Sequence, residues 1–201
     1  MDEILTLLGG MFGTRAIEIT AAICGLINVA LIIRRSLWNY PFGLVMVALY
    51  AVIFFDYKLY SDAILQIFFF VIQVFGLFWW LAGRRETGEL IVLRASPRQT
   101  AVVCAITLSA ILAIGAAMSR YTDASLPYWD ACIATLSVIA QSMLARRLLE
   151  NWLVWIVVDI IAINVFLAKG LHPTAVLYAV FLGLALLGLI QWRKAWLGQQ
   201  A

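Results

Sequence analysis

The sequence predicts an all-α, polytopic membrane protein with seven transmembrane helices. Hydrophobic residues make up 65% of its 201 residues and charged residues only 12%, and the mean hydropathy is +0.99. Soluble domains contain roughly 45–50% apolar and about 25% charged residues. The apolar residues also gather into windows of about 20, the length that a helix needs to span a bilayer core.

Seven apolar windows are the expected spans, and each must be helical because lipid offers no partner for an unpaired backbone amide. They cover roughly residues 14–33, 38–55, 62–82, 101–118, 128–145, 152–168 and 174–192. Residues 1–13 carry acids and no cleavage site, which favours a short interfacial segment over a signal peptide. The one long connection, 83–100, is polar.

Lysine and arginine on the two sides of these spans predict the orientation. Ten of the fourteen basic residues fall in the first-second, third-fourth and fifth-sixth connections and in the tail 193–201. This distribution puts the C-terminus in the cytoplasm and the N-terminus outside. The net charge of +3 then reflects topology, and no basic patch suggests nucleic-acid binding.

An offset of 112 residues aligns the second and third spans with the sixth and seventh. The coinciding residues are Arg34-Arg35 with Arg146-Arg147, Asn39 with Asn151, and Gly76-Leu77-x-x-Trp80 with Gly188-Leu189-x-x-Trp192. We therefore expect three-helix repeats at 14–82 and 128–192, joined by a linker and linker helix at 83–118 (3+1+3). Both triplets would enter the membrane from the same side, as parallel transporter repeats do, with the substrate between them near mid-membrane. A duplicated bundle with only a structural role is the alternative.

Several kinds of chemistry have no support in the sequence. Cys24, Cys104 and Cys132 lie singly in apolar runs and His172 is the only histidine, so no metal site or cofactor is expected. No phosphate-binding GxxxxGK[ST] loop occurs, and no second acid lies in a span beside Asp159. We expect no catalytic residues and no enzyme.

Amides and aromatic rings inside the third span point to a binding site. Gln66 and Gln73 are seven residues apart, so they share one helix face, with Phe69 and Phe70 beside them. A single buried amide is as compatible with interhelical hydrogen bonding as with ligand binding.

Asp159 is the residue that most favours a ligand, because a carboxylate at mid-membrane costs roughly 2.5–3.5 kcal/mol on insertion scales. Trp155 lies four residues earlier on the same face, and Trp152 one turn before it. No lysine or arginine lies mid-span to pair with the acid. An unpaired carboxylate beside indole rings suits an organic cation, since ring faces add about 0.5–2 kcal/mol of cation–π attraction. The alternative is a protonated acid bonded to a neighbouring amide.

Over about residues 16–196 the chain resembles the bacterial nicotinamide riboside transporter (PnuC) family. The motifs are Asn39-Tyr40-x-x-Gly43, Leu59-Tyr60, Leu65-Gln66-x-Phe68-Phe69-Phe70, Gly76, Tyr128-Trp129-Asp130, Leu136-Ser137, Glu150-Asn151-Trp152-x-x-Trp155 and Tyr178. In the family, the sixth helix carries an asparagine after Trp-x-x-Trp. This chain departs from that pattern, because it has Asp159 there. The resemblance implies a SWEET-like bundle in the bacterial cytoplasmic (inner) membrane and suggests a homotrimer.

The resemblance also implies uptake of nicotinamide riboside by facilitated diffusion, with the cargo trapped by a phosphorylating cytoplasmic kinase. We expect alternating access without an energy source, because the sequence contains no nucleotide-binding loop. The ribose hydroxyls and carboxamide of nicotinamide riboside would suit hydrogen bonding to Gln66 and Gln73. Thiamine, another cation, is the alternative cargo, and a non-transporting membrane subunit or sensor is the second alternative. The expected substrate-binding residues are Asn39, Gln66, Phe69, Phe70, Gln73, Trp152, Trp155, Asp159 and Tyr178, the first and last from the resemblance alone.

Overall fold

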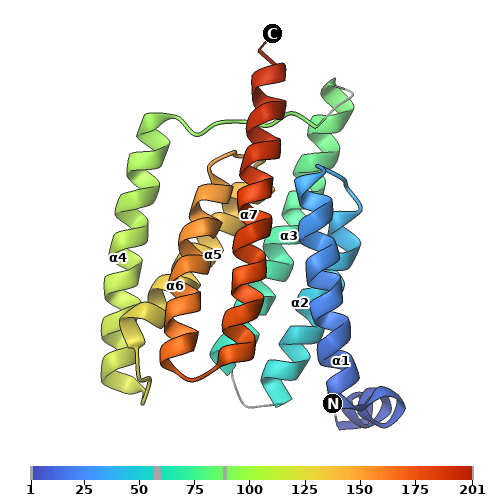
Figure 1. Ribbon diagram of the computed structural model, residues 1–201, viewed down its shortest axis with the longest axis vertical. Helices are drawn as coiled ribbons and strands as arrows, with labels where there is room; N and C mark the ends of the chain where they lie inside the picture. The colour runs from blue at the N-terminus through green and yellow to red at the C-terminus, as the bar shows by residue number, and fades with distance from the viewer. Residues whose placement is uncertain (1, 57–59, 88–89, 201) are drawn as a thin grey trace. The chain divides into compact units, whose positions relative to one another are not determined.

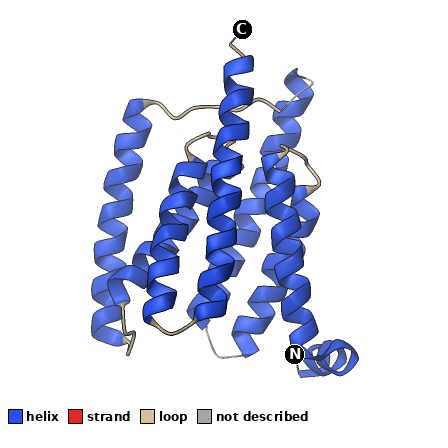
Figure 2. Cartoon of the chain, in the orientation of Figure 1, coloured by secondary structure: helices blue, strands red, loops and turns tan. Residues whose placement is uncertain are grey.

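The computed structural model describes residues 2–56, 60–87 and 90–200, and these form seven helices (Figures 1 and 2). The helices are α1 (Asp2–Ile33), α2 (Asn39–Asp56), α3 (Tyr60–Thr87), α4 (Pro97–Tyr121), α5 (Pro127–Ala145), α6 (Asn151–Ala168) and α7 (His172–Gly198). In the described ranges the only extended pairing is an isolated bridge between Leu93 and Leu148. The chain forms two compact units, residues 1–78 and 79–201.

Six of the seven helices are long and apolar enough to cross a membrane, so the chain is a multi-pass helical membrane protein. The helix that does not meet this measure, among the residues described, is α5, the fifth predicted span. Its polar side chains lower its hydropathy, and two of them, Thr135 and Ser137, are buried. Because α5 packs against both α4 and α6, these side chains are covered by protein rather than lipid, although the Thr135 hydroxyl has no hydrogen-bond partner among the described residues.

In the first unit, α1 packs along α2. The predicted interfacial segment, residues 1–13, is helical from Asp2 onward and belongs to α1. In Figure 1 the first turns of α1 lie at a steep angle to the rest of that helix. The remainder, from Ala16 to Ile33, is the part apolar enough to cross a bilayer.

In the second unit, α4 packs on α5, α5 on α6 and α6 on α7. Gly115 lets α4 approach α5 closely, because a Cβ at that position would overlap the ring of Tyr128. Gly188 plays the same part between α7 and α6, where the Trp152 ring lies against it.

The polar connection predicted over 83–100 is shorter in the structure, because α3 continues to Thr87 and α4 begins at Pro97. Ser96 starts α4 through a capping box: its hydroxyl accepts from the Gln99 amide at 3.2 Å, and the Gln99 side chain accepts from the Ser96 amide at 2.9 Å. Pro97 follows at the first helical position, where its missing N–H costs nothing. The linker helix therefore begins four residues before the predicted residue 101.

The turns that end α1 and α5 have the same backbone geometry, 112 residues apart. Arg35 has a φ of 55° and Arg147 a φ of 61°, the only non-glycine residues with positive φ in the described ranges. The amide of each donates to the carbonyl oxygen three residues earlier, of Ile32 and Leu144 respectively, at 2.8 Å in both turns. Each arginine thus takes the left-handed conformation that commonly ends a helix.

The same two turns also share a side-chain hydrogen bond at the start of the next helix. Asn39 donates its side-chain N–H to the carbonyl oxygen of Ser36, and Asn151 donates to that of Leu148, at 2.6 Å in each case. The coincidence of Arg-Arg and Asn in the sequence therefore corresponds to one local structure built twice.

Candidate functional site

Asp159 lies in the middle of α6 with 3% of its surface exposed. No hydrogen bond or ion pair to its carboxyl group is found among the described residues. Lys169, just beyond the end of α6, forms its ion pair with a different acid. Its ammonium group donates to both carboxylate oxygens of Asp130 at 2.7 and 2.9 Å. A buried acid with no protein partner is costly unless a ligand or a proton compensates it.

Trp152 and Trp155 differ in their surroundings although both precede Asp159 on α6. Trp152 is 2% exposed, and its ring meets that of Trp192 edge-to-face with ring centroids 5.6 Å apart. The Trp80 ring is tilted by 52° against that of Trp192, with centroids 6.1 Å apart. This tryptophan cluster (Trp80, Trp152, Trp192) packs α6 against α7 and the end of α3 within the second unit. Trp155 is only half-buried.

The indole N–H of Trp152 is buried without a hydrogen-bond partner in the described part of the chain. Trp80, by contrast, donates its indole N–H to the carbonyl oxygen of Leu144 at 3.3 Å. An unpaired buried donor costs about 1–3 kcal/mol. Trp152 is therefore both a packing residue and a candidate hydrogen-bond donor.

Tyr178 lies on α7 and stacks on Phe166 of α6, with ring centroids 5.3 Å apart and planes inclined by 27°. Phe181, one turn further along α7, meets the Tyr178 ring edge-on at 6.2 Å. This aromatic group holds the half-buried phenol against α6, the helix that carries Asp159 and Trp155.

In the first unit, three helices bring two buried amides together beside a glycine. Gln73 of α3 is 4% exposed and donates its side-chain N–H to the Gly43 carbonyl oxygen at 3.5 Å. Asn28 of α1, 6% exposed, donates to the Asn39 carbonyl oxygen at 2.7 Å. A Cβ on Gly43 would overlap the Gln73 amide oxygen and lie 2.5 Å from the Asn28 amide nitrogen. We name Asn28, Gly43 and Gln73 the amide cluster.

Sequence reasoning missed Asn28 as a candidate, although its position well inside the first span was the available signal. Asn39, a binding residue expected from the family resemblance, is 3% exposed. Its side-chain N–H donates to the Ser36 carbonyl oxygen in the α1–α2 turn. Gln66 and Phe69 are half-buried on α3, and Phe70 is 40% exposed. In the described ranges no hydrogen bond or ring contact involves Gln66, Phe69 or Phe70.

The two predicted triplets carry different chemistry at matching positions. The residues that correspond at the 112-residue offset are Gly43 with Trp155, Asn28 with Ala140, Gln73 with Ala185, and Val47 with Asp159. The glycine that leaves room for two amides is thus replaced by an indole, and both amides by alanine. The first triplet offers amides, and the second offers an aromatic ring and an acid.

A family model described as "Nicotinamide mononucleotide transporter" matches residues 15–194. The nicotinamide riboside transporter PnuC of Escherichia coli (strain K12) is 26% identical over 201 residues, covering 88% of this chain and 84% of that protein. PnuC of Neisseria mucosa is 27% identical, covering 87% and 70%. The riboflavin/roseoflavin transporter RibM of Streptomyces davaonensis is also 27% identical, covering 87% and 83%.

A crystal structure of the vitamin B3 transporter PnuC shares the fold, with a TM-score of 0.74. The match covers 96% of this chain and 87% of that one, at 24% identity. The resemblance seen in the sequence motifs is thereby confirmed.

Proposed function

The chain belongs to the nicotinamide mononucleotide transporter family, and we propose that it carries nicotinamide riboside across the bacterial inner membrane. Two relatives that match most of the chain are nicotinamide riboside transporters. Nicotinamide riboside carries a pyridinium ring, so it is an aromatic cation.

The observation that favours this cargo is the buried, unpartnered carboxyl group of Asp159 on α6. Its charge would attract the pyridinium in a low-dielectric setting, and the half-buried ring of Trp155 would add cation–π contact of about 0.5–2 kcal/mol. Gln66 and Gln73 would bond the ribose hydroxyls and carboxamide, with Phe69, Phe70 and Tyr178 as aromatic walls. Asn39 and Trp152 complete the proposed binding set, Trp152 through its unpaired indole N–H.

The proposed cycle is alternating access without an energy source. The duplicated turns support the 3+1+3 arrangement, with repeats at 14–82 and 128–192 about the linker helix. We propose a cytoplasmic C-terminus, because ten of the fourteen basic residues lie on that side of the predicted spans. The proposed assembly is a homotrimer. A separate cytoplasmic kinase would trap the cargo by phosphorylation.

Uptake by purified protein in liposomes tests this proposal. Proteoliposomes that enclose a riboside kinase and ATP should accumulate labelled nicotinamide riboside. Proteoliposomes without the enclosed kinase and ATP should not accumulate it. If correctly oriented protein gives no uptake, the assigned cargo is wrong.

A matched ligand pair tests the role of Asp159. The reduced dihydropyridine form of the riboside has nearly the same shape but no positive charge. We expect Asp159→Asn to weaken binding of the cation at least about tenfold, which corresponds to about 1.4 kcal/mol, and to leave binding of the reduced form unchanged. An equal loss of affinity for both ligands would show that Asp159 does not bind the cargo through its charge.

Thiamine is the second candidate cargo, because its thiazolium ring would also meet the acid. A relative that matches most of the chain is a riboflavin/roseoflavin transporter, and riboflavin carries no positive charge, so similarity to relatives alone leaves the cargo open. Competition of unlabelled thiamine and riboflavin against labelled nicotinamide riboside distinguishes them. We expect thiamine to compete more strongly than riboflavin in the wild type, and the difference to vanish in Asp159→Asn.

A further inference from the structure

The described part of the connection between α3 and α4 is attached to other elements of the second unit. We call residues 90–96 the strap. The amide of Leu93 donates to the Arg147 carbonyl oxygen, and the Leu149 amide donates to the Leu93 carbonyl oxygen, each at 2.9 Å. Leu90 and Val92 are 7% and 2% exposed. The strap therefore pairs with the α5–α6 turn and has an apolar underside.

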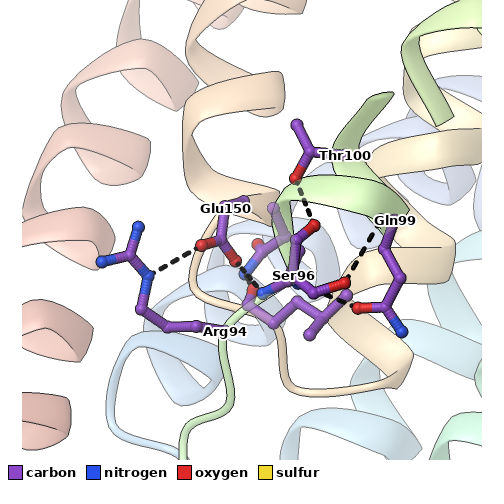
Figure 3. Close-up of polar contacts among 8 residues, drawn as sticks. Arg94, Ser96, Gln99, Thr100 and Glu150 are labelled. Carbon is purple, nitrogen blue, oxygen red and sulfur yellow. Dashed lines mark hydrogen bonds and ion pairs between the residues drawn. The ribbon is translucent and has the colours of Figure 1, made fainter. Parts of the chain in front are cut away.

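Glu150 gives the strap its polar attachment, as Figure 3 shows. One carboxylate oxygen accepts from the Arg94 guanidinium at 2.9 Å and the other from the Ala95 amide at 3.1 Å. Glu150 is also the residue before α6, yet its side chain makes no hydrogen bond to cap that helix. Its carboxylate thus serves the strap, and charge-assisted bonds of this kind are among the stronger ones.

The strap also reaches the end of α7 and the start of α4. The Arg94 guanidinium lies 5.0 Å from the centre of the Trp196 ring, and the Gln199 amide faces the backbone N–H and C=O of Val92 at 3.1 Å each. On the other side, Ser96 begins α4 with its capping box. One short segment thus contacts three elements of the second unit.

The α1–α2 turn has the same backbone as the α5–α6 turn but no acid at the matching position. Glu150 corresponds to Trp38, which is 69% exposed. The fastening is therefore a feature of the second turn alone, added to a structure that the two triplets share.

We propose that Glu150 is a positioning residue that clamps the strap to the start of α6, so that the linker helix α4 moves with α5, α6 and α7 as one body. Gly115 supplies a second attachment, where α4 lies against the Tyr128 ring of α5. The clamp stays closed through the transport cycle. This inference rests on the proposed function only for its uptake measurements.

Hydrogen exchange of the strap amides tests the clamp without any cargo. We expect Glu150→Ala to speed exchange at Leu93 and Ala95 at least about tenfold, because the strap loses its bonds to a charged acceptor. Arg94→Gln should speed it less, since the Ala95 bond survives. The matched control is Arg98→Gln, at an exposed arginine with no described partner, which should leave exchange unchanged. Unchanged exchange in Glu150→Ala would overturn the proposal.

A reversible cross-link tests whether the clamp opens. Leu93 and Leu148 are bridge partners, so Leu93→Cys with Leu148→Cys should form a disulfide, in a background where Cys24, Cys104 and Cys132 are serine. We expect riboside uptake in the oxidised protein to stay within about twofold of the reduced protein. Loss of uptake on oxidation, restored by reductant and absent from either single variant, would show that the strap must open.

Kinetics separate positioning from simple loss of fold. For folded Glu150→Ala, normalised by size-exclusion chromatography, we expect a several-fold lower maximal uptake rate with the KM for nicotinamide riboside kept. Glu150→Gln, which keeps an acceptor for the Ala95 amide, should recover part of the rate. A raised KM with an unchanged maximal rate would contradict the positioning role. If the wild type carries no riboside, the cargo assignment fails, while the exchange result still decides whether Glu150 fastens the strap.

Discussion

Replacing Gly188 by alanine should destabilise the second unit by forcing apart α6 and α7. A Cβ at this position would lie 2.6 Å from three atoms of the Trp152 ring, Cδ2, Cε2 and Cε3. Carbon atoms pack best at about 3.5–4.0 Å, so the overlap is about 1 Å. The ring cannot swing away, because Trp152 is 2% exposed and its edge meets Trp192 at 5.6 Å.

Overpacking of this kind costs about 1–3 kcal/mol. Replacing a helical glycine by alanine returns about 0.5–1 kcal/mol of this cost. For a chain of this length 1 kcal/mol shifts the melting temperature by roughly 2–4 °C, so Gly188→Ala should melt up to about 10 °C below the wild type. Thermal unfolding in detergent, followed by tryptophan fluorescence, measures the shift. Trp152→Phe combined with Gly188→Ala should recover part of the loss, because the smaller ring leaves room for the added methyl group.

Gly183 on the same helix provides the matched control. Nothing lies within 4 Å of a Cβ built there, so Gly183→Ala meets open space. Alanine is favoured over glycine inside a helix by about 0.5–1 kcal/mol, and the control should therefore melt at or above the wild-type temperature. Equal melting temperatures for the two alanine variants would refute the packing assigned to Trp152.

Two further variants test contacts described above. Gly43→Ala should displace the amides of Gln73 and Asn28, so we expect it to raise the KM for riboside uptake at least several-fold while the maximal rate per folded protein changes less; an unchanged KM would remove the amide cluster from cargo binding. Asp130→Asn and Lys169→Gln should each lower the melting temperature slightly, because the pair is only about a quarter exposed. A double-mutant cycle should give a coupling of about 1 kcal/mol, and additive losses would mean that the pair contributes nothing.

The helical class and the approximate span positions could be predicted from the sequence, because lipid imposes one backbone solution on any long apolar run. Helix ends were less predictable. The capping box at Ser96 was readable but lay inside a stretch that looked like a polar loop. The burial of Thr135 and Ser137 depends on which helices cover α5, which composition does not encode.

The candidate site divides in the same way. Asp159 stood out because an acid in an apolar run is costly wherever the helix lies. The difference between Trp152 and Trp155 was not visible, because both indoles precede the acid and only the partner helix decides which is packed away. Asn28 is an in-span amide like Gln73, but its closeness to Gly43 and Gln73 depends on how α1, α2 and α3 pack, which the sequence does not give.

The arginines at the ends of α1 and α5 combine two tasks in one residue. Glycine would adopt the positive φ of Arg35 and Arg147 without the roughly 1–2 kcal/mol that an L-residue loses there. A glycine, however, carries no charge, and charges next to a span decide which way a chain is inserted. In the orientation that we propose, the residue that ends each helix therefore also carries one of the charges expected to direct insertion. Replacing either arginine by glycine would relax the backbone at the turn and remove one of these charges at the same time.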